Sequence, residues 1–173
     1  MTPDKVPTLA LDIAKLTGWS IGPWYPTSNR VDLPHGAKLG DGTAGGAVDL
    51  GPAGPAGAGA RLYGLRRLIT DLHKTYAFQR LAVEDSAYGS RNQFATQLGQ
   101  AEYRGVARLT AHQLGLEFLA VNPSRWKNWL CGSGKADKEQ TQRALAGQFG
   151  VRFESNDEAD SYAILLAVLS GVR

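Results

Sequence analysis

The chain has 173 residues, of which 43% are hydrophobic and 20% charged, and this fits one globular domain with its own core. No apolar run approaches the roughly 20 residues of a membrane-spanning helix, so we expect no membrane partner. One cysteine excludes an internal disulfide and favours a reducing cytoplasm, and a net charge of +3 is compatible with a polyanionic partner without demonstrating one.

The first part of the chain predicts a hairpin followed by an irregular stretch. Two short apolar runs, 9–13 and 18–22, flank a turn with glycine, which is typical of a β-hairpin. A third strand is predicted near 35–39. Residues 40–59 are mostly Gly, Ala and Pro, so we expect a Gly/Pro-rich flexible loop inside a single domain that covers 1–173.

The rest of the chain predicts helices that alternate with short strands. Apolar spacing and turn residues predict helices at 61–76, 93–114, 123–130, 135 or 136 to 149, and 157–169, with strands at 81–83 and 116–121 and a brief extended segment at 151–153. This order predicts an α/β fold, in which a mixed sheet carries helices on its faces.

Four acidic residues stand where an uncompensated charge is costly. Asp12 lies inside the first predicted strand, and Glu84 directly follows the strand 81–83. Asp157 and Asp160 share one face at the start of the last helix. Each has an ordinary explanation, such as an ion pair or the helix dipole. Gathered in one crevice they would repel, and a divalent cation would remove the conflict. Two such ions can flank a phosphodiester.

A basic cluster surrounds the turn before the helix that begins at 135 or 136. Its members are Arg125, Lys127, Lys135, Lys138 and Arg143. A solvated face is the usual explanation of such a run. Here Trp126 and Trp129 interleave with the charges, and Gly132 and Gly134 would let a phosphate approach the backbone. The cluster is therefore a candidate nucleic-acid contact.

These segments resemble the RuvC-type Holliday-junction resolvases of the RNase H-like superfamily, particularly the shorter phage-style members. The matching segments are LALDIAKLTGWS, LAVEDSAYGSRNQFATQLGQAEYRGVA, PSRWKNWLCGSGKADKEQT and DEADSYAILLA. The resemblance implies an RNase H-like sheet with three antiparallel strands followed by parallel ones. It also implies a Mg²⁺-dependent site, with two ions and Mn²⁺ as a substitute, held by Asp12, Glu84, Asp157 and Asp160. The implied protein is a homodimer that nicks two symmetry-related strands of a four-way DNA junction.

The same resemblance suggests roles for residues outside the acidic set. Lys127 and Lys138 match two lysines that contact DNA near the scissile phosphate, and Lys138 would also stabilise developing negative charge. Arg91 and Asn92, which follow Glu84 in sequence, are further candidate DNA contacts. The helix 93–114 matches one that helps to form the dimer interface; a buried helix within one chain is the alternative.

Three departures from the bacterial pattern bear on junction opening. The turn after Asp12 is shorter and lacks Pro-Gly. The bacterial wedge phenylalanine corresponds to Ala87, and Tyr88 or Phe94 is the candidate replacement. The insertion 40–59 has no assigned role.

Other functions stay open on the sequence alone. An RNase H-like nuclease could act on other branched, flap or hybrid nucleic acids, and a junction-binding module could keep the fold without cleaving. A strand, an acid and a Thr-Gly turn also open the phosphate-binding domain of sugar kinases and actin-like ATPases. Those proteins need two such domains, and 173 residues supply one.

Overall fold

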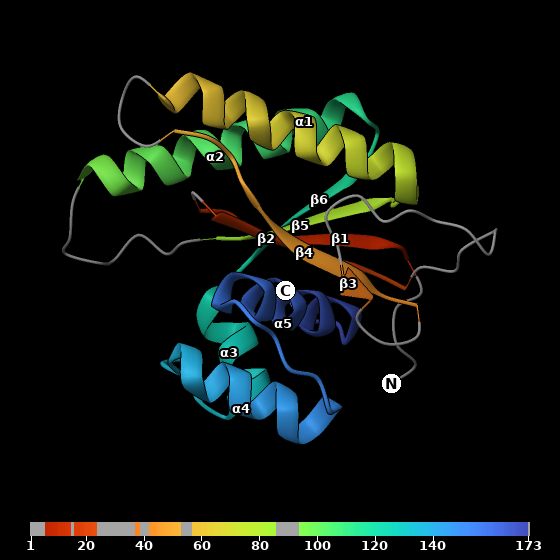
Figure 1. Ribbon diagram of the computed structural model, residues 1–173, viewed down its shortest axis with the longest axis vertical. Helices are drawn as coiled ribbons and strands as arrows, with labels where there is room; N and C mark the ends of the chain where they lie inside the picture. The colour runs from red at the N-terminus through yellow and green to blue at the C-terminus, as the bar shows by residue number, and fades with distance from the viewer. Residues whose placement is uncertain are drawn as a thin grey trace.

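The computed structural model describes residues 6–14, 16–23, 37–38, 42–52, 57–85 and 94–172. These residues form a six-stranded sheet and five α-helices (Figure 1). The strands are β1 (Thr8–Asp12), β2 (Leu16–Gly22), β3 (Ala37–Lys38), β4 (Ala44–Asp49), β5 (Arg80–Glu84) and β6 (Glu117–Val121). The helices are α1 (Ala58–Tyr76), α2 (Phe94–Gln113), α3 (Pro123–Cys131), α4 (Lys138–Phe149) and α5 (Asn156–Leu169).

The sheet has the order β3-β4-β2-β1-β5-β6 and is mixed. β1 with β2, β2 with β4 and β3 with β4 pair antiparallel, whereas β1 with β5 and β5 with β6 pair parallel. This confirms the predicted arrangement of antiparallel strands followed by parallel ones. Because β1 and β5 are parallel and Leu11 lies opposite Val83, their carboxyl ends fall side by side.

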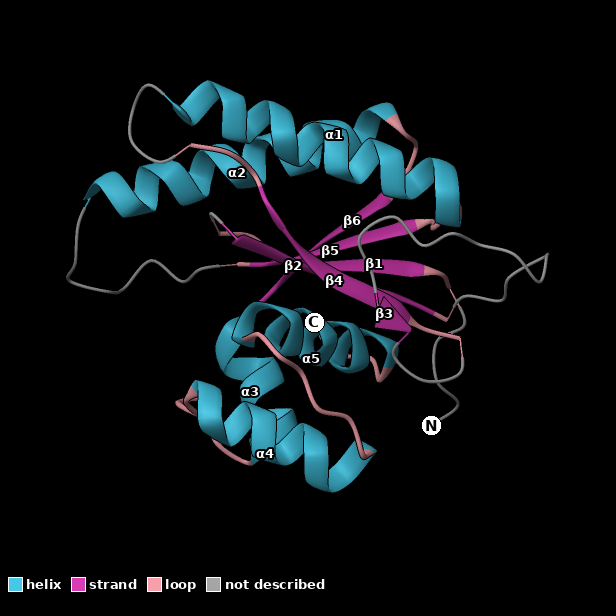
Figure 2. Cartoon of the chain, in the orientation of Figure 1, coloured by secondary structure: helices cyan, strands magenta, loops and turns pink. Residues whose placement is uncertain are grey.

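Two helical layers cover the sheet. α1 and α2 lie on one face, and α3, α4 and α5 lie on the other (Figures 1 and 2). Successive strand residues point to opposite faces, so Leu11 packs in the core on the α1 side while Ala10 and Ala82 pack in the core on the α5 side. Asp12 and Glu84, each two residues further along, therefore face α5.

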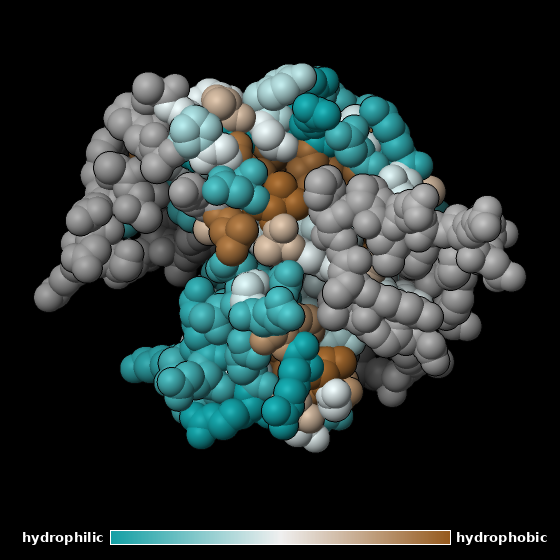
Figure 3. Space-filling model, viewed as in Figure 1, coloured by the Kyte–Doolittle hydropathy of each residue, from teal (hydrophilic) through white to brown (hydrophobic). Residues whose placement is uncertain are grey.

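The surface over α3 and α4 is largely hydrophilic on the face that Figure 3 shows, as expected for helices that cover the sheet from outside. No helix among the described residues is long and apolar enough to cross a bilayer.

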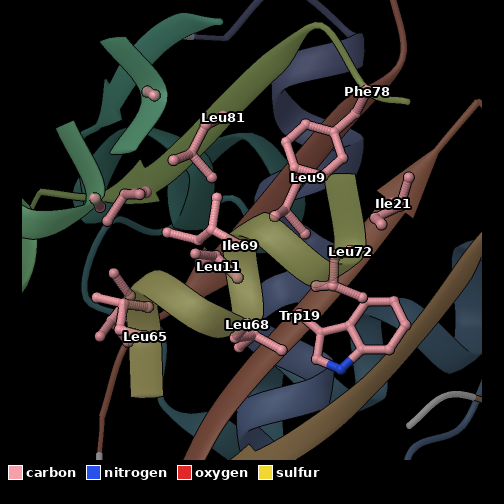
Figure 4. Close-up of a cluster of buried hydrophobic side chains, with 14 of the residues drawn as sticks. Leu9, Leu11, Trp19, Ile21, Leu65, Leu68, Ile69, Leu72, Phe78 and Leu81 are labelled. Atoms are coloured by element: carbon pink, nitrogen blue, oxygen red, sulfur yellow. The ribbon is translucent and has the colours of Figure 1, made fainter. Parts of the chain in front are cut away.

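The core beneath α1 follows the helical period that the sequence predicts. Four apolar side chains of α1 lie against β1, β2 and β5 in Figure 4: Leu65, Leu68, Ile69 and Leu72. The indole of Trp19 in β2 is fully buried in the same cluster, 6.0 Å from the ring of Tyr76 between centroids. This packing fixes the sheet from the side opposite α5.

Residues 40–59, predicted as a flexible loop, contain β4 and the first residues of α1, so that prediction is wrong for these parts. β4 pairs with β2 from Ala44 opposite Ile21 to Asp49 opposite Leu16, and its first three residues are buried. A strand between two neighbours is held by main-chain hydrogen bonds, so it forms without bulky side chains. Its small residues also let α5 contact β4.

Candidate active site

The four predicted acidic residues line one open pocket at the carboxyl ends of β1 and β5. The full lining is Asp12, Ile13, Ala14, Glu84, Gln100, Lys127, Lys138, Asp157 and Asp160. The acids come from the ends of two strands and from the first two turns of α5. The structure thus brings together residues that are far apart in sequence, and it adds two of the predicted lysines to the same pocket.

The first turn of α5 reaches the pocket because Gly18 has no side chain. Gly18 of β2 lies opposite Asp12 in the hairpin. A Cβ atom placed on Gly18 would stand 1.8 Å from the main-chain oxygen of Asp157. Glycine at this position therefore lets the helix approach the sheet closely enough for Asp157 and Asp12 to share a pocket.

Two further contacts hold α5 in this place. The Ser155 hydroxyl caps the helix by accepting a hydrogen bond from the main-chain N–H of Glu158 at 3.1 Å. The hydroxyls of Ser20 in β2 and Ser161 in α5 form a buried hydrogen bond of 3.0 Å. Asp160 is only 8% exposed, and it shares the pocket with the strand-end acids Asp12 and Glu84.

Burial and the closeness of other acids raise the pKa values of two aspartates in the pocket. Burial, followed by the charges of Glu84, Asp160 and Asp157, raises the pKa of Asp12 to about 8, and Lys138 opposes this shift. Burial also raises the pKa of Asp160 to about 6, against the opposing charge of Lys138. Near neutral pH the cation-free pocket therefore retains a proton that a bound cation would replace.

Glu84 is oriented by a tryptophan that sequence reasoning did not place in the site. Burial raises the pKa of Glu84, and a hydrogen bond from Trp126 opposes this shift. The Trp126 indole Nε1 donates to Glu84 Oε2 at 3.0 Å, and Trp126 is fully buried. The Lys127 ammonium lies 5.3 Å from the centroid of the same ring. Trp126 thus connects the acidic and basic parts of the pocket.

Of the predicted DNA-contacting residues, Lys127 and Lys138 line the pocket. The Lys138 ammonium lies 3.6 Å from Asp157 Oδ1, and its side chain is 57% exposed. Lys138 is the first residue of α4, where a capping box between Asp137 and Gln140 fixes the start of the helix. The other predicted contacts fall in two groups: Arg125 and Lys135 are exposed outside the pocket lining, and Tyr88, Arg91 and Asn92 lie outside the described residues.

Gln100 is a second residue that sequence reasoning did not assign to the site. It reaches the pocket from α2 and donates from Nε2 to the main-chain oxygen of Ile13 at 3.3 Å. In the sequence it stands among small residues of a long helix, and nothing in its spacing distinguishes it from a solvated glutamine.

The chemistry of the pocket fits a hard divalent cation, which prefers carboxylate oxygens and would offset their repulsion. Within the described ranges, no group of three or more His, Cys, Asp or Glu side chains is arranged to hold a metal ion as it stands. Two of the carboxylates are engaged by other side chains. Glu84 accepts a hydrogen bond from Trp126, and Asp157 forms an ion pair with Lys138. Binding of an ion would therefore require these side chains to turn toward a common centre.

Comparisons with known proteins agree with this geometry. The family model "Crossover junction endodeoxyribonuclease RuvC" matches residues 54–168. The protein of that name from Nitratidesulfovibrio vulgaris is 36% identical over 129 residues, which cover 73% of this chain and 76% of the relative. The one from Rubrobacter xylanophilus is 34% identical over 100 residues, which cover 57% of this chain but only 55% of the relative.

Among solved structures, Thermus thermophilus RuvC in complex with Holliday junction substrate superposes with a TM-score of 0.68 at 20% identity. The match covers 96% of each chain, and at this identity it shows the fold. The matched family region contains Glu84, Asp157 and Asp160 but begins after Asp12. The place of Asp12 in the pocket therefore rests on the β1–β5 pairing.

Proposed function

This chain belongs to the RuvC family of crossover junction endodeoxyribonucleases, and from that premise we propose that it hydrolyses phosphodiester bonds in four-way DNA junctions. The observation that carries the proposal is the convergence of Asp12, Glu84, Asp157 and Asp160 on one pocket beside two lysines. Burial and the repulsion between these carboxylates raise the pKa values of Asp12 and Asp160. Such perturbed groups cluster at functional sites.

We infer that the four carboxylates hold Mg²⁺, or Mn²⁺ in its place, as two ions per pocket. Bound there, the ions would activate a water molecule and stabilise the leaving oxygen of the phosphodiester. The protein's own contribution is to supply oxygen ligands from three rigid elements. Asp12 gives up its proton to bind, and Glu84 is held by Trp126.

Lys127 and Lys138 supply positive charge on the rim of the pocket. Lys138 pairs with Asp157 at 3.6 Å in the absence of DNA, and its exposed ammonium can exchange this partner for a phosphate. A cation beside the scissile phosphate stabilises the negative charge that develops during hydrolysis. Arg125 and Lys135 are exposed and lie close in sequence to Lys127 and Lys138. They would contact DNA phosphates on either side of the scissile one. DNA contacts by Tyr88, Arg91 and Asn92 stay predictions.

We also propose that the protein acts as a homodimer through the outer face of α2. Leu98 and Leu109 are 51% and 55% exposed. Their spacing, with exposed Ala101 and Gly105 between them, places these residues on one side of the helix. Small residues between two leucines allow the close approach of a second copy. Two pockets related by symmetry would then nick two strands of one junction.

Replacing Leu109 with Glu is expected to convert the dimer into a monomer, because it buries a charge in the proposed interface. Sedimentation equilibrium measures the change in mass. Tyr63→Glu is the control, since Tyr63 is 63% exposed and belongs to α1, so it is not part of this stripe. A dimer that persists in Leu109→Glu, or a monomeric wild-type protein, would contradict this assembly.

Cleavage of a matched set of DNA substrates tests the proposed activity. The set contains a four-way junction, a three-way junction, a flap, a duplex and an RNA–DNA hybrid that share one labelled strand. We expect Mg²⁺-dependent nicks at symmetric positions on two strands of the four-way junction and far slower cleavage of the others. Equal cleavage of flap or hybrid would favour a broader nuclease. Junction binding without cleavage in Mg²⁺ and Mn²⁺ would show a binding module.

Within the family, we place the chain with the phage-style members, on the short turn after Asp12 and on Ala87 in place of the bacterial wedge phenylalanine. A DNA substrate also requires the protein to be in a compartment that contains DNA. We propose that this compartment is the cytoplasm.

A further inference from the structure

We propose that Gln100 and Arg104 of α2 are positioning residues, which hold the chain directly after Asp12 and directly after Glu84 so that the two carboxylates stay within reach of a common cation. This inference rests on the proposed function, because it concerns how the same pocket is assembled. It assigns a role to the inner side of α2, whereas the outer side carries the proposed dimer contact.

Gln100 acts on the end of β1. Its Nε2 donates to the main-chain oxygen of Ile13, the residue after Asp12, at 3.3 Å. Ile13 is itself 5% exposed in the core beneath α1 and α2, so its side chain and its carbonyl are both held from the same side. The Asp12 side chain points to the opposite face of the sheet, into the pocket.

Arg104 acts in the same way on the end of β5. Its Nη1 forms an ion pair with Oδ1 of Asp85, the residue after Glu84. The Arg104 side chain is 21% exposed and that of Asp85 is 44% exposed, so the pair is partly shielded from water. Asp85 is also held through its main-chain N–H, which donates to the oxygen of Val121 at 2.8 Å. Glu84 and Asp85 are consecutive, so anchoring Asp85 on the α2 side fixes the direction in which Glu84 leaves the strand.

The two residues lie on the same side of α2. Gln100 and Arg104 are four residues apart, so their side chains leave the helix in similar directions. One helix therefore contacts the chain at the ends of both β1 and β5. α2 is anchored independently, since Arg61 Nε of α1 donates to the Tyr103 hydroxyl at 2.8 Å.

The ends of β1 and β5 need to be held in place because charge repulsion disfavours the arrangement of the pocket. The carboxylates repel one another, and the charges of Glu84, Asp160 and Asp157 all disfavour ionised Asp12. Without fixed strand ends, the side chains would relieve this repulsion by moving apart. Residues that orient metal ligands typically change affinity by about 10- to 100-fold when they are replaced.

The test uses the full chain with the variants Gln100→Leu and Arg104→Gln. Mn²⁺ binding is measured without DNA by electron paramagnetic resonance of the free ion, and junction binding is measured in EDTA. We expect each variant to bind Mn²⁺ about 10- to 100-fold more weakly, with junction affinity and the midpoint of thermal unfolding in EDTA close to wild type. The exchange Asp85→Arg with Arg104→Asp is expected to recover Mn²⁺ affinity that either single change loses.

Matched controls lie on the same helix. Arg108→Gln removes a guanidinium that stacks 5.1 Å from the Phe118 ring centroid, and Gln113→Leu changes an exposed residue at the end of α2. Both should bind Mn²⁺ as wild type does. Unchanged Mn²⁺ affinity in both test variants, or an equal loss in the controls, would overturn the inference. If wild type binds Mn²⁺ but nicks no junction, the proposed function fails, and the variants still decide the positioning role.

Discussion

Replacing Asp12 with Asn is expected to abolish Mg²⁺-dependent nicking of a four-way junction while junction binding in EDTA is retained. The amide keeps the size of the side chain but removes the anionic oxygen that faces the pocket from the end of β1. Loss of one preorganised active-site group commonly lowers the rate by about 10²- to 10³-fold, and loss of a metal ligand should reach at least the upper end. Single-turnover cleavage of a labelled junction measures the effect.

Asp71→Asn is the matched control for this change. Asp71 is an exposed aspartate on α1 that pairs with Arg67 and Lys74 at 3.4 and 3.3 Å, and it lies outside the pocket. This variant should cleave and bind as wild type does. Wild-type cleavage by Asp12→Asn would remove the four-carboxylate site from the proposed mechanism. Loss of junction binding in the same variant would mean that the change acts on the fold.

In the absence of divalent cations, the free energy of unfolding is expected to fall as pH rises from about 4 to about 8. The pKa of Asp12 rises from 3.8 to about 8 on folding, and that of Asp160 from 3.8 to about 6. Between these values the folded protein holds protons that the unfolded chain has released, so rising pH favours unfolding. Each group adds a slope of up to about 1.4 kcal/mol per pH unit. Of these two aspartates, both act below about pH 6, and only Asp12 still acts from about 6 to 8.

Urea unfolding at a series of pH values in EDTA measures this dependence. Asp12→Asn should lack the part of the slope between pH 6 and 8 and should be more stable than wild type at pH 8, because it removes the charge that the pocket disfavours. Added Mg²⁺ should stabilise wild type at pH 8, since it binds the folded state. An Asp12→Asn variant with the wild-type slope would show that Asp12 ionises normally, while Asp71→Asn should keep that slope.

Local patterns in the sequence predicted most of the helices and the first strands. The apolar period of α1 and the apolar run of β1 are properties of neighbouring residues, so they can be read without tertiary contacts. β4 was missed because its Gly and Ala residues carry no such pattern. Its pairing partner is β2, and only main-chain hydrogen bonds to a distant part of the chain make it a strand.

For the site, the unusual placement of Asp12, Glu84, Asp157 and Asp160 was visible in the sequence, because a charge in a buried strand or on a buried helix face is costly wherever it occurs. The residues that hold these acids in place were not visible. Gln100 and Ile13 are 87 positions apart, and Trp126 and Glu84 are 42 apart. Such contacts depend on strand register and helix docking.

From the sequence alone, then, come the four acids, the two lysines and most of the elements that carry them. The pairing of β1 with β5 sends Asp12 and Glu84 to one face of the sheet. The tertiary structure alone decides that this face meets the first turn of α5, because Gly18 leaves room for it. The tertiary structure also brings Gln100 and Arg104 of α2 into contact with the chain at the ends of β1 and β5. The physical reason is that charge and periodicity are local, whereas the packing of one element against another is set by chain segments that no short pattern connects.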